Sequence, residues 1–216
     1  MMMRRMCAPN KWPIARKGKP KFILAPKASA QDNVSLLMAL RDMLGIAKTR
    51  KEARILLLEG QIAVNGKIRK DESFPLRLFD ILSLTKTNKF FRMGVTKSRK
   101  FVLEETGEKD SEHKICKVIG KRILRNNKVQ LNLDNGYNLL DDIKANIKDS
   151  VVLNLKDNKI IKVLHLKEGA KAVSCSGKHL GLSGEIKEIN VKDKTVVIKT
   201  SLGETMVQIK NLLVIG

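Results

Sequence analysis

Cysteine is scarce in this sequence, and its three cysteines lie far apart. Cys7, Cys116 and Cys175 are odd in number and form no C-x-x-C pair, which argues against a zinc site or a disulfide framework. His113 and Cys116 form a lone H-x-x-C pair, and without a second ligand pair we expect it to be structural or exposed. The sequence therefore predicts no metal, no cofactor and free thiols in a reducing compartment.

Long apolar runs are also lacking. No run approaches the ~20 residues that a membrane-spanning helix requires. Arg4 and Arg5 are followed by Pro9, Lys11 and Pro13, where a signal peptide would have an apolar stretch. We therefore expect a cytoplasmic protein with no membrane partner.

Acidic residues are few compared with basic ones. The 216 residues include 43 Lys and Arg against 22 Asp and Glu, a formal net charge of +21. Such a charge repels itself, and a polyanionic partner would relieve the repulsion. Nucleic acid is the first candidate and an acidic membrane surface the second. The apolar fraction of 43% is enough to fill cores, and the length fits two or three domains.

Residues 1–32 are predicted to form an extended arm. They contain four of the five prolines, each of which fixes φ and removes a backbone donor, so we expect no regular element. Trp12 and Phe22 are interleaved with the basic residues and could stack on unpaired bases. Either an RNA-contacting arm or a solvated basic tail fits this pattern. The basic residues of this segment are Arg4, Arg5, Lys11, Arg16, Lys17, Lys19, Lys21 and Lys27.

Residues 49–66 are predicted to form a helix, a stop, a strand and a tight turn. Thr49 and Glu52 have the spacing of a capping box. Gly60 stands where the helix must end, and Asn65-Gly66 is a strong hairpin signal. An earlier helix is predicted over residues 34–44, where apolar residues fall on one arc.

The second of these helices carries cations on one side. Arg50 and Arg54 are four residues apart with Lys51 beside them, an arrangement suited to a phosphate backbone. Ile55 and Leu58 lie off the main apolar arc of the helix. We expect another part of the chain or a neighbouring protein to cover them.

This helix pair and the small sheet predicted after it resemble the alpha-L-type RNA-binding domain. In that family, which includes some enzymes, the cationic side of the second helix and the adjacent hairpin grip structured RNA. The matching positions are Lys48, Arg50, Lys51, Arg54, Lys67 and Arg69.

The rest of the chain is predicted to be rich in strands. Segments 90–93 and 100–103 flank a polar run and predict a hairpin whose loop is cationic through Lys97, Arg99 and Lys100. Residues 104–112 are acidic and resemble a boundary or surface loop. From Lys114 onward short alternating segments predict a central β-rich domain, with nothing that looks catalytic.

Residues 169–186 resemble the KOW motif. A glycine precedes alternating strand residues, and three further glycines follow at spacings of four and three. Lys178 and His179 lie in the glycine-rich loop, which in KOW proteins joins strands of a small SH3-like barrel and often contacts nucleic acid or protein. A structural barrel with peripheral RNA contact, an RNA anchor and a protein-docking surface all remain open.

The predicted fold class is α+β and multi-domain. It comprises an extended basic N-terminal arm (1–32), an alpha-L-type RNA-binding domain with a hairpin (33–103), a central β-rich domain (104–166) and a C-terminal SH3-like KOW barrel (167–216). In this order the parts resemble small-subunit ribosomal protein four of the archaeal and eukaryotic type, and the likeness spans nearly the whole chain. The chain ends at Gly216 without the longer tail usual in eukaryotic members, which favours an archaeal or reduced lineage.

The resemblance implies a structural component of the small ribosomal subunit that supports its assembly and translation. Its partners would be small-subunit ribosomal RNA and neighbouring ribosomal proteins, with no small-molecule substrate and no enzymatic activity. The predicted RNA-binding residues are Arg4, Arg5, Lys11, Trp12, Arg16, Lys17, Lys19, Lys21, Arg41, Lys48, Arg50, Lys51, Arg54, Lys67, Arg69, Lys97, Arg99, Lys178 and His179.

Two other functions would use the same modules as handles for RNA. One is an RNA-modifying enzyme, which would need a pocket with a placed acid or nucleophile. The other is a transcription or translation factor that binds through the KOW barrel.

Overall fold

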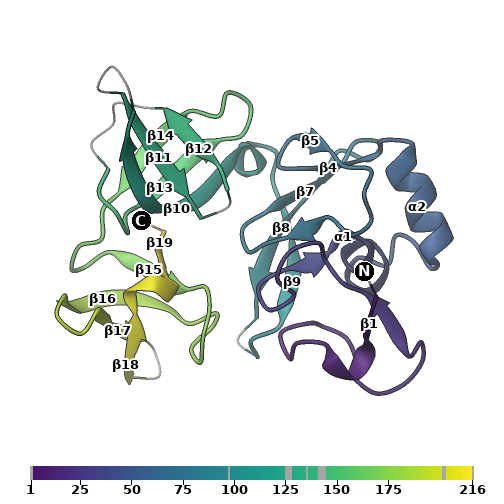
Figure 1. Cartoon of the computed structure of the whole chain (residues 1–216), viewed down its shortest axis with the longest axis horizontal. Coiled ribbons are helices and arrows are strands. Elements are labelled where there is room, and N and C mark those ends of the chain that lie inside the picture. Colours follow the sequence, from purple (N-terminus) through teal and green to yellow (C-terminus); the bar gives the residue numbers. More distant parts are fainter. Residues whose placement is uncertain are drawn as a thin grey trace. The chain divides into compact units, whose positions relative to one another are not determined.

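The computed structural model describes residues 2–96, 98–124, 128–134, 136–140, 145–200 and 203–215. The chain forms two compact units, Met1–Glu112 and His113–Gly216 (Figure 1). Both units consist of antiparallel sheets with few helices, which confirms the fold class expected from the sequence in its coarse form. The boundaries of the four predicted segments stay predictions.

In the described part of the first unit there are two short α-helices, two 3-10 turns (Arg5–Cys7 and Lys109–Glu112) and a five-stranded antiparallel sheet with the order β5-β4-β7-β8-β9. Two strand pairs, β1 with β2 and β3 with β6, lie outside that sheet. Its elements are β1 (Met2–Arg4), β2 (Phe22–Leu24), β3 (Val34–Ser35), α1 (Leu36–Met38), α2 (Arg50–Leu58), β4 (Ile62–Val64), β5 (Lys67–Ile68), β6 (Pro75–Leu76), β7 (Ile81–Leu84), β8 (Lys89–Val95) and β9 (Phe101–Thr106).

The first predicted helix begins two residues later than expected. Val34 and Ser35 form β3, and α1 continues into a π-helical turn over Ala39–Met43. The amides of Leu36 and Leu37 donate to backbone carbonyls of the segment before β6, each at 3.0 Å. These bonds satisfy two of the amides that a helix start leaves without an internal partner, so no capping side chain is needed.

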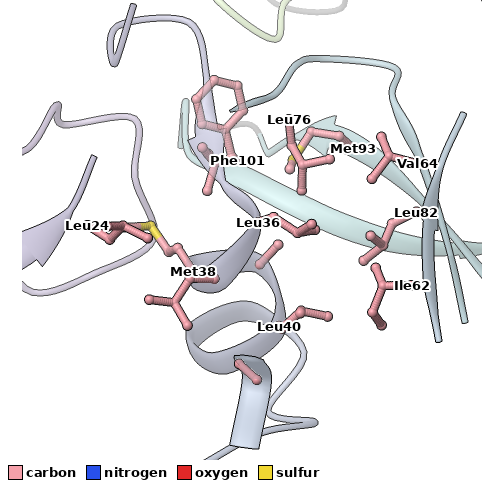
Figure 2. Close-up of a cluster of buried hydrophobic side chains, with 14 of the residues drawn as sticks. Leu24, Leu36, Met38, Leu40, Ile62, Val64, Leu76, Leu82, Met93 and Phe101 are labelled. Atoms are coloured by element: carbon pink, nitrogen blue, oxygen red, sulfur yellow. The ribbon is translucent and has the colours of Figure 1, made fainter. Parts of the chain in front are cut away.

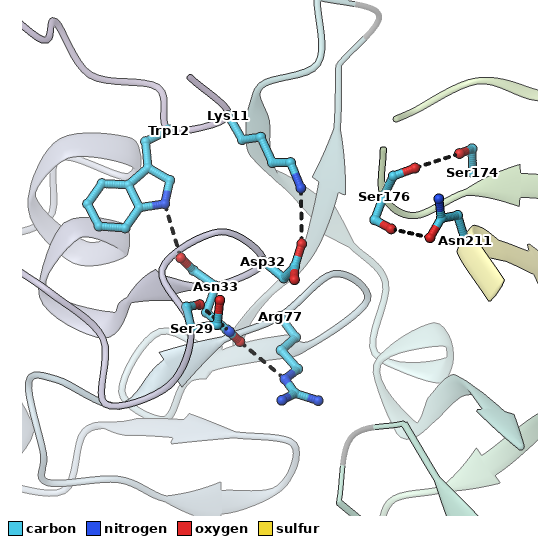
Figure 3. Close-up of polar contacts among 9 residues, drawn as sticks. All are labelled: Lys11, Trp12, Ser29, Asp32, Asn33, Arg77, Ser174, Ser176 and Asn211. Atoms are coloured by element: carbon cyan, nitrogen blue, oxygen red, sulfur yellow. Dashed lines mark hydrogen bonds and ion pairs between the residues drawn. The ribbon is translucent and has the colours of Figure 1, made fainter. Parts of the chain in front are cut away.

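The N-terminal segment corrects two expectations. Despite its prolines it forms a regular pair, β1 with β2. Trp12 is 1% exposed, and its indole Nε1 donates to the carbonyl of Asn33 at 3.0 Å, so its ring is covered rather than open to bases (Figure 3). The amide of Phe101 donates to the carbonyl of Lys11 at 2.8 Å. The segment therefore packs into the first unit, because burying a large indole stabilises this path.

One hydrophobic cluster joins α1 to the sheet of the first unit. Figure 2 shows Leu36 and Leu40 on the helix facing Ile62, Val64 and Leu82 on β4 and β7. These side chains are at most 1% exposed. This packing fixes the position of the sheet, in which β4 and β5 form the hairpin.

Ile55 and Leu58 remain exposed on α2, at 47% and 56%. From the sequence we expect either another part of the chain or a neighbouring protein to cover these side chains. No segment among the described residues covers them. Coverage by a neighbouring protein stays a prediction.

The second unit contains two five-stranded antiparallel sheets, with orders β12-β11-β10-β13-β14 and β18-β17-β16-β15-β19. The series of strands predicted after Lys114 is present, although β10 runs unbroken where several short pieces were expected. The strands are β10 (His113–Ile123), β11 (Val129–Leu133), β12 (Asn138–Leu140), β13 (Ser150–Asn154), β14 (Ile160–Leu164), β15 (Lys171–Ser174), β16 (Ser183–Asn190), β17 (Thr195–Thr200), β18 (Gly203–Gln208) and β19 (Leu212–Val214).

Two side chains tie these sheets together. The Lys117 ammonium of β10 donates to the carbonyls of Ile209, Lys210 and Leu212 at 2.5, 3.1 and 2.7 Å. The hydroxyl of Ser150 on β13 accepts from the amide of a β19 residue at 2.9 Å. Burial lowers the pKa of Lys117 to about 8. The central and C-terminal β regions are therefore joined by buried polar contacts within one unit.

Candidate nucleic-acid interface

Helix α2 begins with the capping box expected from the sequence. The Thr49 hydroxyl accepts from the Glu52 amide at 3.2 Å, and the Glu52 carboxylate accepts from the Lys48 amide at 2.8 Å. The hydrogen bond that the Glu52 carboxylate accepts from the Lys48 amide, followed by a separate side-chain hydrogen bond between this carboxylate and Thr49, lowers the pKa of Glu52. These bonds fix the first turn, from which the cations of the helix project.

Arg50 of α2 is held by a carboxylate that the sequence did not indicate. Its Nε lies 2.9 Å from Glu72 Oε2, and its Nη2 donates to the other oxygen. The hydrogen bond with Arg50 lowers the pKa of Glu72 and raises that of Arg50, and the nearby Arg54 lowers the pKa of Glu72 further. A bidentate pair of this kind leaves Arg50 less available to phosphate.

Lys51, Arg54 and Lys67 are exposed on α2 and the hairpin. Their side chains form no hydrogen bond or ion pair with any residue that the structure describes. The hairpin lies beside the end of the helix, since a Cβ built on Gly60 would stand 3.5 Å from Ile68. The structure thus brings the helix and the hairpin together, as the sequence predicted.

The turn of this hairpin is fixed by a buried side chain. Asn65 and Gly66 have φ values of +51° and +75°, as a tight hairpin turn requires. The Asn65 amide group donates to Asp80 Oδ1, and its oxygen accepts from the Ile81 amide, both at 3.0 Å. Asp80 lies 15 residues from Asn65, and the Asn-Gly signal in the sequence did not reveal this partner. The position of Lys67 on the hairpin therefore depends on Asp80.

Besides Arg50, five of the predicted RNA-binding cations have partners within the protein. The Arg69 guanidinium stacks on Phe74 with 4.4 Å to the ring centroid. The other four make hydrogen bonds of 2.7–3.0 Å. They are Arg5 with the Ala15 carbonyl, Arg16 with Asn10 and the Met6 carbonyl, Lys11 with Asp32 (Figure 3), and Arg41 with Asp42.

Other predicted cations of the first unit are exposed at the surface. The exposed set is Arg4, Lys17, Lys19, Lys21, Lys48 and Arg99. Lys21 lies 6.0 Å from the Phe22 ring centroid, and Phe22 itself is 47% exposed. Lys97 lies outside the described residues.

The glycine-rich loop of the second unit connects β15 to β16. Lys178 is exposed and His179 half-buried in this loop. The loop is tied to the segment before β19, because the Ser176 hydroxyl donates to Asn211 Oδ1 at 2.8 Å (Figure 3). A Cβ on Gly184 would stand 2.3 Å from the Lys199 carbonyl, so a glycine at this position permits the close approach of β16 to β17.

The described residues contain no group of three or more His, Cys, Asp or Glu that could hold a metal ion. None of the helices in the described ranges is long and apolar enough to cross a membrane.

Comparisons with known proteins agree with this arrangement. A family model described as "Ribosomal family S4e" matches residues 87–160, and one described as "S4 domain" matches residues 37–82. The small ribosomal subunit protein eS4 of Methanosphaera stadtmanae is 34% identical in an alignment 223 positions long, which covers 99% of this chain and 91% of that protein. The chain belongs to ribosomal family S4e. The resemblance inferred from the sequence is therefore confirmed.

Further members of family S4e are similar over nearly the same span. The eS4 protein of Methanocella arvoryzae is 34% identical, over 99% of this chain and 93% of that protein. A crystal structure of the 30S ribosomal protein S4e from Thermoplasma acidophilum has a TM-score of 0.73 at 24% identity and covers 86% of this chain and 95% of that one. This structural match shows that the two proteins share a fold.

The range matched by the S4 domain model includes the predicted RNA-binding elements of the first unit. The S4 domain match spans most of α1, the whole of α2, the hairpin of β4 and β5, β6, and the start of β7. It therefore includes the helix and hairpin that expose Lys51, Arg54 and Lys67.

Proposed function

We propose that this chain is a structural protein of the small ribosomal subunit that binds ribosomal RNA and supports subunit assembly and translation. The observation that carries the proposal is the S4 domain match over a helix and hairpin on which Lys51, Arg54 and Lys67 are exposed, with no hydrogen bond or ion pair to any described residue. Phosphate contacts from such cations supply affinity without reading sequence, and the shape of folded RNA supplies selectivity. The chain then acts by binding, with no catalytic step.

We also propose the finer assignments made from the sequence. The first unit is an alpha-L-type RNA-binding domain, and β15 to β19 form an SH3-like KOW barrel. Neighbouring ribosomal proteins are further partners, and the protein works in the cytoplasm. The N-terminal segment contacts RNA through its exposed cations, Arg4, Lys17, Lys19 and Lys21.

Paired variants of α2 test the proposal. Lys51→Ala with Arg54→Ala should weaken binding to a small-subunit ribosomal RNA transcript and leave the thermal midpoint nearly unchanged, because both side chains are exposed. The slope of log affinity against log salt should become shallower by about 1.4–1.8, which corresponds to about two lost phosphate contacts.

The control is Lys159→Ala with Lys162→Ala, two exposed lysines at the β13–β14 turn and on β14. It should change affinity much less. Equal losses in both double variants would show a non-specific effect of net charge and contradict the assignment of α2 as the RNA-binding helix.

A further inference from the structure

The second unit contains a groove whose chemistry the proposed function leaves unused. Its volume is about 570 Å³, within the range of about 300–1,000 Å³ typical of small-molecule sites. Three of its lining lysines lie on separate segments, before β13, before β17 and after β18. We call it the three-lysine groove, after Lys148, Lys194 and Lys210.

Backbone bonds hold these segments in place. The Lys148 amide donates to the Val118 carbonyl at 2.9 Å, and the Ile209 amide donates to the Lys194 carbonyl at 2.9 Å. The ammonium of Lys117, which also lines the groove, donates to the Ile209 carbonyl. The lysines are therefore presented from a prearranged frame, and binding there would require little ordering.

Two isoleucines form an apolar part of the groove and are more than half exposed. Ile119 is 59% exposed and Ile147 is 53% exposed. Apolar side chains that remain open beside a cavity favour a ligand that covers them. The flat face of an unpaired nucleobase could cover both isoleucine side chains.

The charge of the groove favours an anion. Lys148, Lys194 and Lys210 make no side-chain hydrogen bond or ion pair with any described residue. Two carboxylates also line the groove, of which Asp193 accepts from the Asn190 amide group at 2.7 Å and Asp134 interacts with Lys117. With Lys117 the lining has four lysines against these two carboxylates, so its net charge is positive, on a unit with nineteen Lys and Arg against ten Asp and Glu.

We propose that the three-lysine groove binds one unpaired nucleotide of ribosomal RNA, with its base against Ile119 and Ile147 and its phosphates near the lysines. This rests on the proposed function and adds a second, single-strand contact to that of α2. An anionic peptide would satisfy the lysines but would lack the flat face that the two isoleucines favour.

Methyl NMR on the full chain, labelled at isoleucine δ1 methyl groups, tests the proposal directly. Titration with a single-stranded RNA hexamer should shift the Ile119 and Ile147 resonances saturably. Ile161, which is 54% exposed on β14 and does not line the groove, should not shift. A blunt RNA duplex of the same composition should leave all three nearly unchanged.

Variants measure the contribution of the apolar pair. Ile119→Thr with Ile147→Thr should weaken hexamer binding about tenfold, the loss expected from about 1.4 kcal/mol of apolar contact. Ile161→Thr should bind like the parent protein. Threonine keeps the β-branched shape, and thermal midpoints identify any variant that fails to fold, in which case the NMR titration decides.

Four results would overturn the inference. One is no shift at Ile119 and Ile147 with the hexamer, and another is an equal shift with the duplex. The third is an equal shift, at equal affinity, with a hexaglutamate peptide, which would assign the groove to acidic protein segments. If groove variants bind the ribosomal transcript normally while the α2 double variant does not, the proposed function stands and the groove inference fails.

Discussion

Lys117 and Cys175 are predicted to give the free energy of unfolding opposite dependences on pH. Burial lowers the pKa of Lys117 to about 8, whereas an unfolded lysine titrates near ~10.4. Between these values the unfolded state binds more protons, so stability rises with pH. Burial raises the pKa of Cys175 to about 12, against ~8.5 when unfolded. Above pH ~8.5 the folded state retains the proton, so stability falls as pH rises.

The two effects are similar in size. For Lys117 the difference of about 2.4 units corresponds to about 3 kcal/mol gained between pH ~8 and ~10.4, at about 1.36 kcal/mol per unit. For Cys175 the loss by pH ~10.5 is about 2 kcal/mol, after allowing for the partial exposure of this residue. The parent protein should therefore show little net change from this pair.

Single and double variants separate the contributions. Urea unfolding, followed by circular dichroism, would be measured from pH 7.5 to 10.5 for Lys117→Met, Cys175→Ala and the double variant. Relative to the double variant, stability should rise by about 3 kcal/mol in Cys175→Ala and fall by about 2 kcal/mol in Lys117→Met. The other titrating groups are common to the variants. Because Cys175 raises the pKa of Lys117 and Lys117 lowers that of Cys175, removing either partner enlarges the pKa shift of the one that remains and widens the difference between the two single variants. Parallel curves for the two single variants would refute the reasoning.

Three further changes have expected outcomes. Glu72→Gln should free Arg50 and raise affinity for the ribosomal transcript a few-fold. The slope of log affinity against log salt should steepen by about 0.7–0.9. Unchanged binding would show that Arg50 does not face RNA. Asn65→Ala should lower urea stability by about 2 kcal/mol more than Asn88→Ala, because both have positive φ but only Asn65 has buried hydrogen bonds. Gly184→Ala should cost more than about 2 kcal/mol by separating β16 from β17, and a neutral result in thermal melts would mean that the strands move apart easily.

Elements set by neighbouring residues could be predicted from the sequence. The capping box at Thr49, the helix end at Gly60 and the turn at Asn65 are all present. Each depends on contacts within a few residues of chain, where the identity of the side chain decides the backbone conformation. The start of α1 was misplaced because β3 is set by its pairing with β6, more than forty residues later.

Contacts between distant residues could not be predicted. Trp12 is buried by a hydrogen bond to Asn33 and by packing into the core, although its basic neighbours suggested a surface role. Lys117 reaches carbonyls more than ninety residues away. The sequence reads the same whether an aromatic or cationic side chain is exposed at the surface or buried against a hydrogen-bond partner. Only the fold distinguishes the two roles.

The predicted RNA-binding cations differ in how available their side chains are to RNA. Five of the predicted arginines pair with protein groups, whereas the predicted lysines in the described ranges mostly do not, with Lys11 the clear exception. A guanidinium is planar, weakly hydrated and offers five donors, so it suits carbonyls, carboxylates and ring faces inside the protein. A lysine ammonium is strongly hydrated and stays at the surface, where it can replace counterions on RNA. Much of the salt-dependent affinity of this chain is therefore expected to come from lysines such as Lys51 and Lys67, together with Arg54.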